Sequence, residues 1–432
     1  MTNRTYGGIS AGHGTALLVG AVLGPGMLVL PHLAATAAGP ASVLAWAGLL
    51  ALSVPVALTF AALGARYPDG GGVASFVGLA FGRPASAVAG WWFFGAVPIG
   101  TVAGALVGGQ YVEACLGVNG TLAGGLILAA AFATNAAGLR TSGGLQIGFV
   151  VLLVALLTAA VVTAAPHADP ANFTPFAPYG AAGVASAAGV LMFAFVGWEA
   201  ASHLSAEFAD RGKGLIRATV VTLVVIALLY LGVSVVSVGV LGPGMTGVPL
   251  TAMLETGIGG AARPVTGVVA VLLTFGAINT YLAGAARLGA ALARDGALPG
   301  WFARGGAPGE TPYRSLGLLA VLSVPVLVWA VDLDLLMRAT SACLAAVTAA
   351  GVAAAVRLLP PGRHRRTAMV GSGLSLVALA FCGLYLVVPA VLALVAWGAL
   401  RVAAPRPASP GGARRTKRGY KRRRAPSGGQ YS

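Results

Sequence analysis

The chain has 432 residues, of which 57% are hydrophobic and only 9% are charged. Soluble domains carry about 25% charged residues, so this composition excludes an ordinary water-soluble protein. The apolar fraction is also too high for a disordered chain. What remains is an all-α polytopic membrane protein. The 64 glycines fit that class, because small residues let helices approach closely in lipid.

The distribution of apolar residues predicts twelve membrane spans, since a crossing helix needs about 20 apolar residues. The predicted spans are residues 13–37, 41–64, 84–114, 121–138, 144–165, 183–206, 216–241, 264–290, 315–331, 334–356, 367–384 and 387–403. The stretch 367–403 is divided in two because Pro389 lies near the expected turn. Residues 1–12 lack a strongly basic region and a cleavage site, which favours an uncleaved first span.

The basic residues of the loops predict the orientation of the chain. The loops that follow even-numbered spans carry Arg66, Arg83, Arg140, Arg211, Lys213, Arg304, Arg314, Arg363, Arg365 and Arg366. The opposite loops carry only Arg263, together with Asp169, Glu255, Asp332 and Asp334. The positive-inside rule therefore places both termini in the cytoplasm. Arginine outnumbers lysine by 24 to 3, which favours a GC-rich bacterial source and hence the bacterial cell membrane.

The segment 404–432 accounts for much of the net charge of +16. It holds nine Lys and Arg residues and no acidic residue among Pro, Gly and Ser, a composition typical of a disordered tail. It is interpreted either as a topological anchor or as a segment that attracts anionic lipids. A basic block appended to a membrane domain does not favour nucleic-acid binding.

The first predicted span contains Gly24-Pro25-Gly26 near its middle. Proline removes a backbone donor and clashes with the preceding turn, so this sequence breaks the helix. Lipid does not tolerate free backbone groups, so the break must line a cavity or lie within protein. A simple kink is the alternative interpretation.

The sixth predicted span carries a second interruption, at residues 192–199, where Gly197 and Glu199 lie near mid-membrane. The sixth span follows the first by five spans, which is an odd number. The units 13–165 and 183–356 would therefore have opposite orientations in the membrane. Paired interrupted helices in two inverted halves mark the substrate site of a secondary transporter. The N-termini of half-helices attract a carboxylate, and free carbonyls at their C-termini accept from an ammonium group. Together they suit a zwitterionic α-amino acid.

Four motifs resemble those of one transporter family, the amino acid–polyamine–organocation (APC) superfamily with the LeuT fold. They occupy residues 24–31, 66–76, 195–200 with 206–208, and 293–299 with 302–304; the second is similar to the loop after the family's second helix. Residues 71–82 and 199–208 are similar to the amino-acid efflux branch, which exports methionine and branched-chain amino acids. The resemblance implies five plus five inverted spans, two further C-terminal helices and alternating access.

The resemblance also implies a set of substrate-binding residues. Backbone around Gly24, Pro25, Gly26 and Met27 would hold the substrate carboxylate. Carbonyls near Leu23, Phe193, Phe195 and Val196 would hold its amino group. Phe193 falls at the family's aromatic gate. The remaining candidates for the substrate site are Gly197, Trp198 and Tyr281. Pro25 departs from the small polar residue of many relatives and removes one donor to the carboxylate.

Glu199 is the strongest candidate for proton coupling, because a carboxylate near mid-bilayer is costly and marks function by default. His203 and Glu207 follow at helical spacing on the same face, so a relay is geometrically possible. The alternatives are a neutral Glu199 that bonds loose backbone, a core histidine, and a Glu207 at the water interface.

Some relatives place a sodium site between spans one and eight, for which Thr274, Asn279 and Thr280 are candidates. Others use a lysine in span five, which this chain lacks in residues 144–165. The efflux branch favours proton antiport. The cysteines Cys115, Cys343 and Cys382 are far apart, so neither a metal site nor a cofactor is predicted.

The predicted function is a secondary transporter that exports neutral, apolar amino acids by proton antiport. The interrupted spans offer no acid pair for a dibasic substrate and no free arginine for an acidic one. An importer or exchanger coupled to protons or sodium is the first alternative, and an amino-acid sensor without flux is the second. An enzyme is not predicted, because the sequence contains no H-E-x-x-H metal-binding motif.

Overall fold

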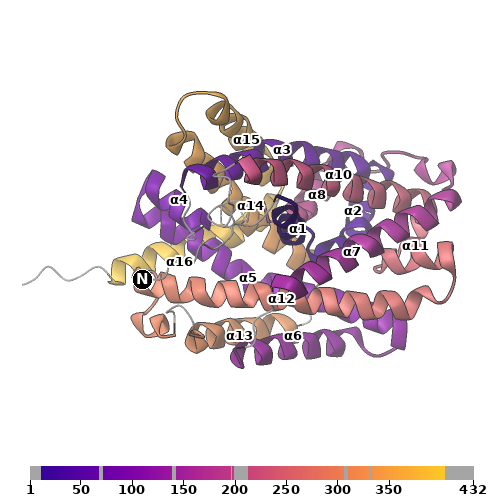
Figure 1. Ribbon diagram of the computed structural model, residues 1–432. Helices are drawn as coiled ribbons and strands as arrows, with labels where there is room; N and C mark the ends of the chain where they lie inside the picture. Colours follow the sequence, from indigo (N-terminus) through magenta and orange to yellow (C-terminus); the bar gives the residue numbers. More distant parts are fainter. Residues whose placement is uncertain are drawn as a thin grey trace, which may run out of the picture.

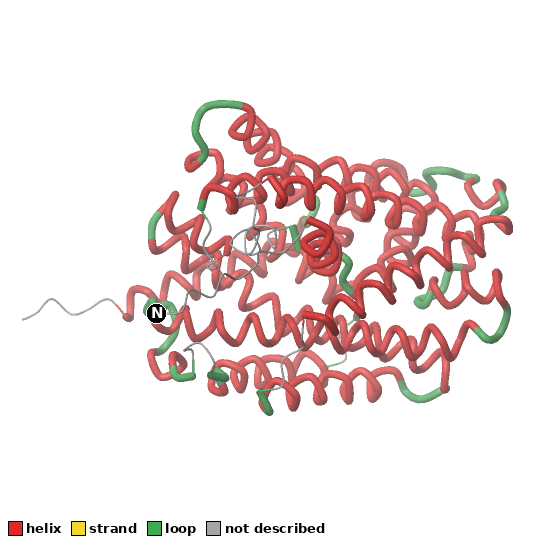
Figure 2. Tube along the Cα trace, viewed as in Figure 1, coloured by secondary structure: helices red, strands yellow, loops and turns green. Residues whose placement is uncertain are grey.

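The computed structural model describes residues 11–67, 72–138, 143–195, 197–198, 213–305, 310–329 and 332–403, and every regular element in these ranges is a helix (Figure 2). Helices satisfy all their backbone groups internally, as lipid requires. By length and composition, seven of these helical stretches could cross a membrane: Leu30–Arg66, Arg83–Leu116, Ile147–His167, Lys213–Gly244, Ala262–Arg294, Leu333–Leu358 and Gly383–Arg401. The expected all-helical membrane architecture is confirmed, and the total of twelve crossings stays a prediction.

The first half of the chain forms helices within the five spans predicted between residues 13 and 165. Its elements are α1 (Ala11–Val22), η1 (Pro25–Leu28), α2 (Leu30–Ala38), α3 (Ser42–Arg66), α4 (Gly72–Phe81), α5 (Arg83–Leu116), α6 (Gly120–Ala136) and α7 (Gly143–Ala164). Span 13–37 is thus divided at the Gly-Pro-Gly sequence, as predicted.

The second half repeats this division in α8 and η5. Its elements are α8 (Gly180–Leu191), η5 (Met192–Phe195), α10 (Lys213–Leu241), α11 (Pro249–Ile258), α12 (Ala262–Arg294), α13 (Tyr313–Val328), α14 (Leu333–Leu358), α15 (Arg363–Ala380) and α16 (Val387–Ala403). The last two helices are separate, as the position of Pro389 predicted. The inverted relation between the two halves stays a prediction.

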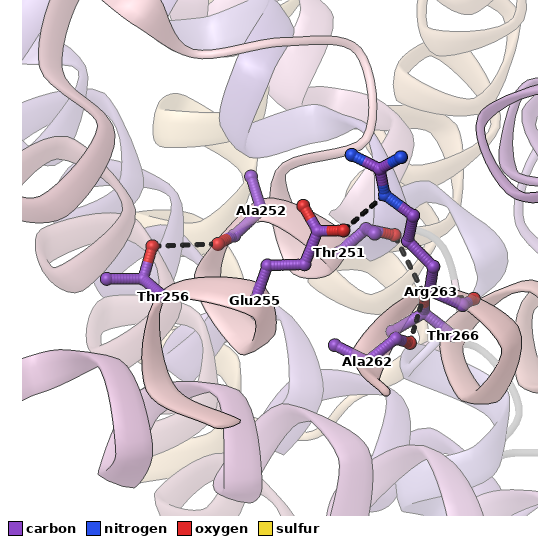
Figure 3. Close-up of polar contacts among 7 residues, drawn as sticks. All are labelled: Thr251, Ala252, Glu255, Thr256, Ala262, Arg263 and Thr266. Carbon is purple, nitrogen blue, oxygen red and sulfur yellow. Dashed lines mark hydrogen bonds and ion pairs between the residues drawn. The ribbon is translucent and has the colours of Figure 1, made fainter. Parts of the chain in front are cut away.

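Two helices lie where the sequence predicted only loops, and that interpretation was wrong. Helix α4 overlaps the motif at residues 66–76 and lies directly before α5. It buries Val73, Phe76 and Val77. Helix α11 precedes α12, and Figure 3 shows how the two are joined. Arg263 pairs with Glu255 across the corner, while the hydroxyls of Thr251 and Thr266 lie 2.9 Å apart.

The long helix α5 organises the packing, because it contacts α6, α12 and α14. Its approach to α6 depends on small residues: a Cβ at Gly109 would lie 2.0 Å from the carbonyl oxygen of Gly120. Helix α1 lies near the middle of the view in Figure 1 and packs against α7 and α10. Helix α2 packs against α8, and η1 contacts η5. The two interrupted segments therefore meet inside the bundle.

Candidate binding site at two helix breaks

The first break begins where α1 ends at Val22. Gly24 is extended, with φ −86° and ψ 176°, and Pro25 then starts the short turn η1. Proline suits this position, because the first residue of a helix has no intrahelical use for its N–H. The segment resumes as α2 at Leu30, with Pro31 in its first turn. The break thus covers several consecutive residues and is more than a kink.

Carbonyl groups freed by this break accept hydrogen bonds from neighbouring helices. The Tyr230 hydroxyl on α10 donates to the carbonyl oxygen of Val22 over 3.1 Å. The Tyr111 hydroxyl on α5 donates to the carbonyl oxygen of Leu28 over 2.7 Å. Each tyrosine replaces an intrahelical bond that the break removes, and this is how irregular backbone becomes tolerable inside a membrane protein.

The second break lies directly against the first. Gly197 has φ +113°, and a Cβ there would lie 2.2 Å from the carbonyl oxygen of Ala21. At Gly26, a Cβ would lie 2.7 Å from Cδ1 of Phe193. Both glycines are therefore required by close approach, since any side chain would collide with the opposite segment.

A cavity of about 50 Å³ lies between the two breaks and the helices α5, α10, α12 and α14. Its lining residues are Ala21, Val22, Gly24, Pro25, Gly26, Met27, Phe93, Ala96, Val97, Gly100, Thr101, Gly104, Phe193, Ala194, Tyr230, Ala277, Ile278, Tyr281, Thr340 and Leu344. Within the described part of the chain, no charged side chain lines it.

Six of the predicted substrate-binding residues line this cavity. They are Gly24, Pro25, Gly26, Met27, Phe193 and Tyr281. Leu23, Phe195 and Trp198 are buried beside the breaks but do not line it, and Gly197 contributes through its contact with α1. Val196 lies outside the described residues.

The two threonine hydroxyls of the wall donate to backbone carbonyls. The Thr101 hydroxyl donates to the carbonyl of Val97 over 2.7 Å, and the Thr340 hydroxyl donates to that of Leu336 over 2.8 Å. Both are bonds to the preceding turn of the same helix. The cavity therefore offers a substrate side chain methyl, methylene and aromatic surface.

Sequence reasoning missed the contributions of α5, α10 and α14. The α5 wall follows a pattern that could have been found, because Ala96, Gly100, Gly104 and Gly108 recur at every fourth position and small residues at that spacing form one helix face. Tyr230 and Thr340 gave no such signal, since each is one of several polar residues in its helix and nothing in the sequence indicates which of them face the cavity.

The proposed proton relay cannot be placed. Glu199, His203 and Glu207 all lie outside the described residues.

The proposed ion site consists of three residues with separate partners. Thr274 and Thr280 donate to carbonyls of their own helix, those of Ala270 and Gly276. The Asn279 side-chain oxygen accepts from Thr134 over 2.9 Å and from Asn135 over 2.6 Å, both on α6. None of the three lines the cavity, so a sodium site stays a prediction. Among the described residues, no group of His, Cys, Asp or Glu side chains could hold a metal ion.

The fold and the site together define a multi-pass membrane protein with an apolar cavity at two helix breaks. Comparison with known proteins agrees with this class. The amino acid permease family model matches residues 14–402. The uncharacterized amino acid permease YecA of Bacillus subtilis (strain 168) is 34% identical over 392 residues, which are 88% of this chain and 92% of YecA.

Two further relatives have names that state a substrate. The L-methionine/branched-chain amino acid exporter YjeH of Escherichia coli (strain K12) is 30% identical over 382 residues, 86% of this chain and 90% of YjeH. The branched-chain amino acid permease BcaP of Bacillus subtilis is 25% identical over 333 residues, 72% of each chain. The chain belongs to the amino acid permease family, so the resemblance to APC transporters is confirmed. These proteins are transporters and not enzymes.

Proposed function

We propose that the protein is a secondary active transporter of neutral, apolar amino acids of the methionine, leucine, isoleucine and valine class. It exports them by proton antiport, through alternating access of the cavity between the two breaks. The observation that carries this proposal is the cavity itself, which joins backbone polar groups at the breaks to a wall on which the described residues place no charged side chain.

The two parts of the cavity suit the two parts of such a substrate. Of the break's amides, Pro25 has no N–H, and the N–H of Gly26 has no acceptor among the described residues. That donor is available to a carboxylate. Phe93, Val97 and Leu344 supply apolar surface for the side chain. An acidic or basic side chain would find no charged partner among the described residues of the wall, and burying a charge in that way is strongly unfavourable.

The size of the cavity supports a transport cycle. A volume of about 50 Å³ holds about four water molecules at roughly 10–15 Å³ each, less than methionine needs. The cavity of the described form is therefore too small for the substrate, and substrate binding requires it to widen. Phe193, whose ring lies against Gly26, is the side chain we expect to move.

The relatives support the substrate class and the direction of transport. The name of YjeH states export of methionine and branched-chain amino acids, and that of BcaP states a branched-chain substrate. We infer export and proton coupling from the efflux-branch motifs at residues 71–82 and 199–208. The second of these motifs includes Glu199.

Counterflow in proteoliposomes tests the proposal. Vesicles loaded with unlabelled methionine should accumulate labelled methionine, and external leucine, isoleucine or valine should compete with it. Lysine and glutamate should not compete, because the wall cannot neutralise their side chains. Absence of counterflow with every neutral amino acid would overturn the proposed function, and competition by lysine equal to that by leucine would overturn the substrate class.

A further inference from the structure

The end of α1 has one carbonyl whose hydrogen-bonding capacity is filled. The oxygen of Val22 accepts from the N–H of Gly24 over 2.9 Å and from the Tyr230 hydroxyl over 3.1 Å. A carbonyl oxygen has two lone pairs, so both are in use. Although Val22 lines the cavity, its oxygen has no capacity left for a substrate.

The Tyr230 hydroxyl is held in a fixed direction. Its residue is 2% exposed, and its ring packs edge-on against Trp46 of α3, with ring centroids 5.0 Å apart. A hydroxyl has one proton, and this one is committed to the Val22 carbonyl. Toward any further partner, the phenol oxygen can act only as an acceptor.

This acceptor lies at the C-terminal end of a 12-residue helix. The C-terminal end of a helix carries partial negative charge and favours a cation. A carboxylate would meet repulsion there from the helix end and would find an oxygen without a proton to give. An ammonium group supplies both the positive charge and the donors that this end of the cavity lacks.

We propose that the Tyr230 oxygen accepts a hydrogen bond from the substrate's α-ammonium group, and so fixes which end of the amino acid faces the end of α1. The inference rests on the proposed function. It adds a side-chain acceptor from α10 to the backbone groups of the two breaks, and it places the carboxylate away from Val22, toward Gly26.

Tyr230→Phe tests the proposal, and Tyr111→Phe is its matched control. Each substitution removes one buried hydroxyl that donates to a carbonyl of the first break, but only Tyr230 lines the cavity. We expect Tyr230→Phe to raise the counterflow KM for methionine about tenfold, the effect of losing one hydrogen bond to a charged group. Tyr111→Phe should leave that KM unchanged, although both variants lose thermal stability.

A substrate analogue separates binding from structure. 4-(Methylthio)butanoate is methionine without its α-amino group, so its inhibition constant should be equal in the wild type and in Tyr230→Phe. An unchanged methionine KM in Tyr230→Phe, or an equal rise in both variants, would overturn the inference. Weaker inhibition by the analogue in Tyr230→Phe, to the same degree as for methionine, would also overturn it. Absence of wild-type counterflow would overturn the proposed function instead.

Discussion

Gly24 and Gly26 stand two positions apart in the first break, yet their surroundings differ. A Cβ at Gly26 would lie 2.7 Å from Cδ1 of Phe193, whereas a Cβ at Gly24 would meet no atom within 4 Å. Gly24 also has a backbone conformation that alanine adopts freely. Glycine is therefore a steric requirement at position 26 only.

We predict that Gly26→Ala lowers the free energy of unfolding by about 1–3 kcal/mol, the usual effect of overpacking. Gly24→Ala should leave it unchanged, because the added methyl has space. Thermal unfolding of the purified variants in detergent measures both. Equal losses of stability would contradict the described contact between Gly26 and Phe193.

The sequence alone was enough to identify the backbone part of the site. Gly-Pro-Gly inside an apolar span favours a helix break over a simple kink, so Gly24, Pro25 and Gly26 could be predicted to line a cavity. Tyr230 could not, since its partner Val22 is 208 positions away. The small-residue face of α5 could be found from its spacing, but only tertiary packing shows that this face lies against the breaks.

The two interrupted segments meet at Gly197, where an L side chain is excluded for two reasons. Its φ of +113° is unfavourable for other residues, and a Cβ would collide with the Ala21 carbonyl oxygen at 2.2 Å. Gly180, at the start of α8, shares only the first constraint: its φ is +58° and a Cβ there would meet open space.

This pair makes a test of the contact between the breaks. Gly180→Ala should cost about 1–2 kcal/mol of unfolding free energy, the price of a left-handed conformation. Gly197→Ala should cost clearly more and should also abolish methionine counterflow, because η5 must move away from α1. Similar stability of the two variants in thermal unfolding would show that the segments do not touch as described.

The amide of Asn279 joins α12 to α6. Its side-chain oxygen accepts from Thr134 and Asn135, so Asn279→Ala removes both of these hydrogen bonds between the helices, while the two donors keep acceptors in the α6 backbone. We predict a loss of about 1–3 kcal/mol of unfolding free energy, equal in the presence and absence of sodium. If sodium stabilised the wild type and not the variant, Asn279 would be an ion ligand instead.

Helices long enough to span a membrane could be located from hydropathy, and the structure has helices in each of those ranges. Helices α4 and α11 could not, because each has ten residues and falls below the length that a membrane span needs. Both are recognisable only from what they pack against: α4 against α5 and α14, and α11 against α7 and α12.

Coupling of substrate transport to protons is a property of the whole protein, because alternating access must expose one binding site to each side of the membrane in turn. With proton antiport, vesicles that are acidic inside should accumulate labelled methionine, since protons leaving the vesicle drive the substrate inward. Reversal of the pH gradient should drive methionine out. Glu199→Gln should retain exchange and lose this dependence. A wild-type flux that ignores gradients of both signs would contradict proton coupling.

Selenomethionine locates the substrate directly, because selenium scatters X-rays anomalously and the protein can be produced with ordinary methionine. Crystals grown with selenomethionine should show one anomalous peak between the two breaks, in the cavity that Gly26, Phe193 and Tyr230 line, with the ligand's amino group toward Tyr230. Saturated crystals in which the peak lies outside this cavity, while methionine counterflow persists in vesicles, would contradict the assignment of the site.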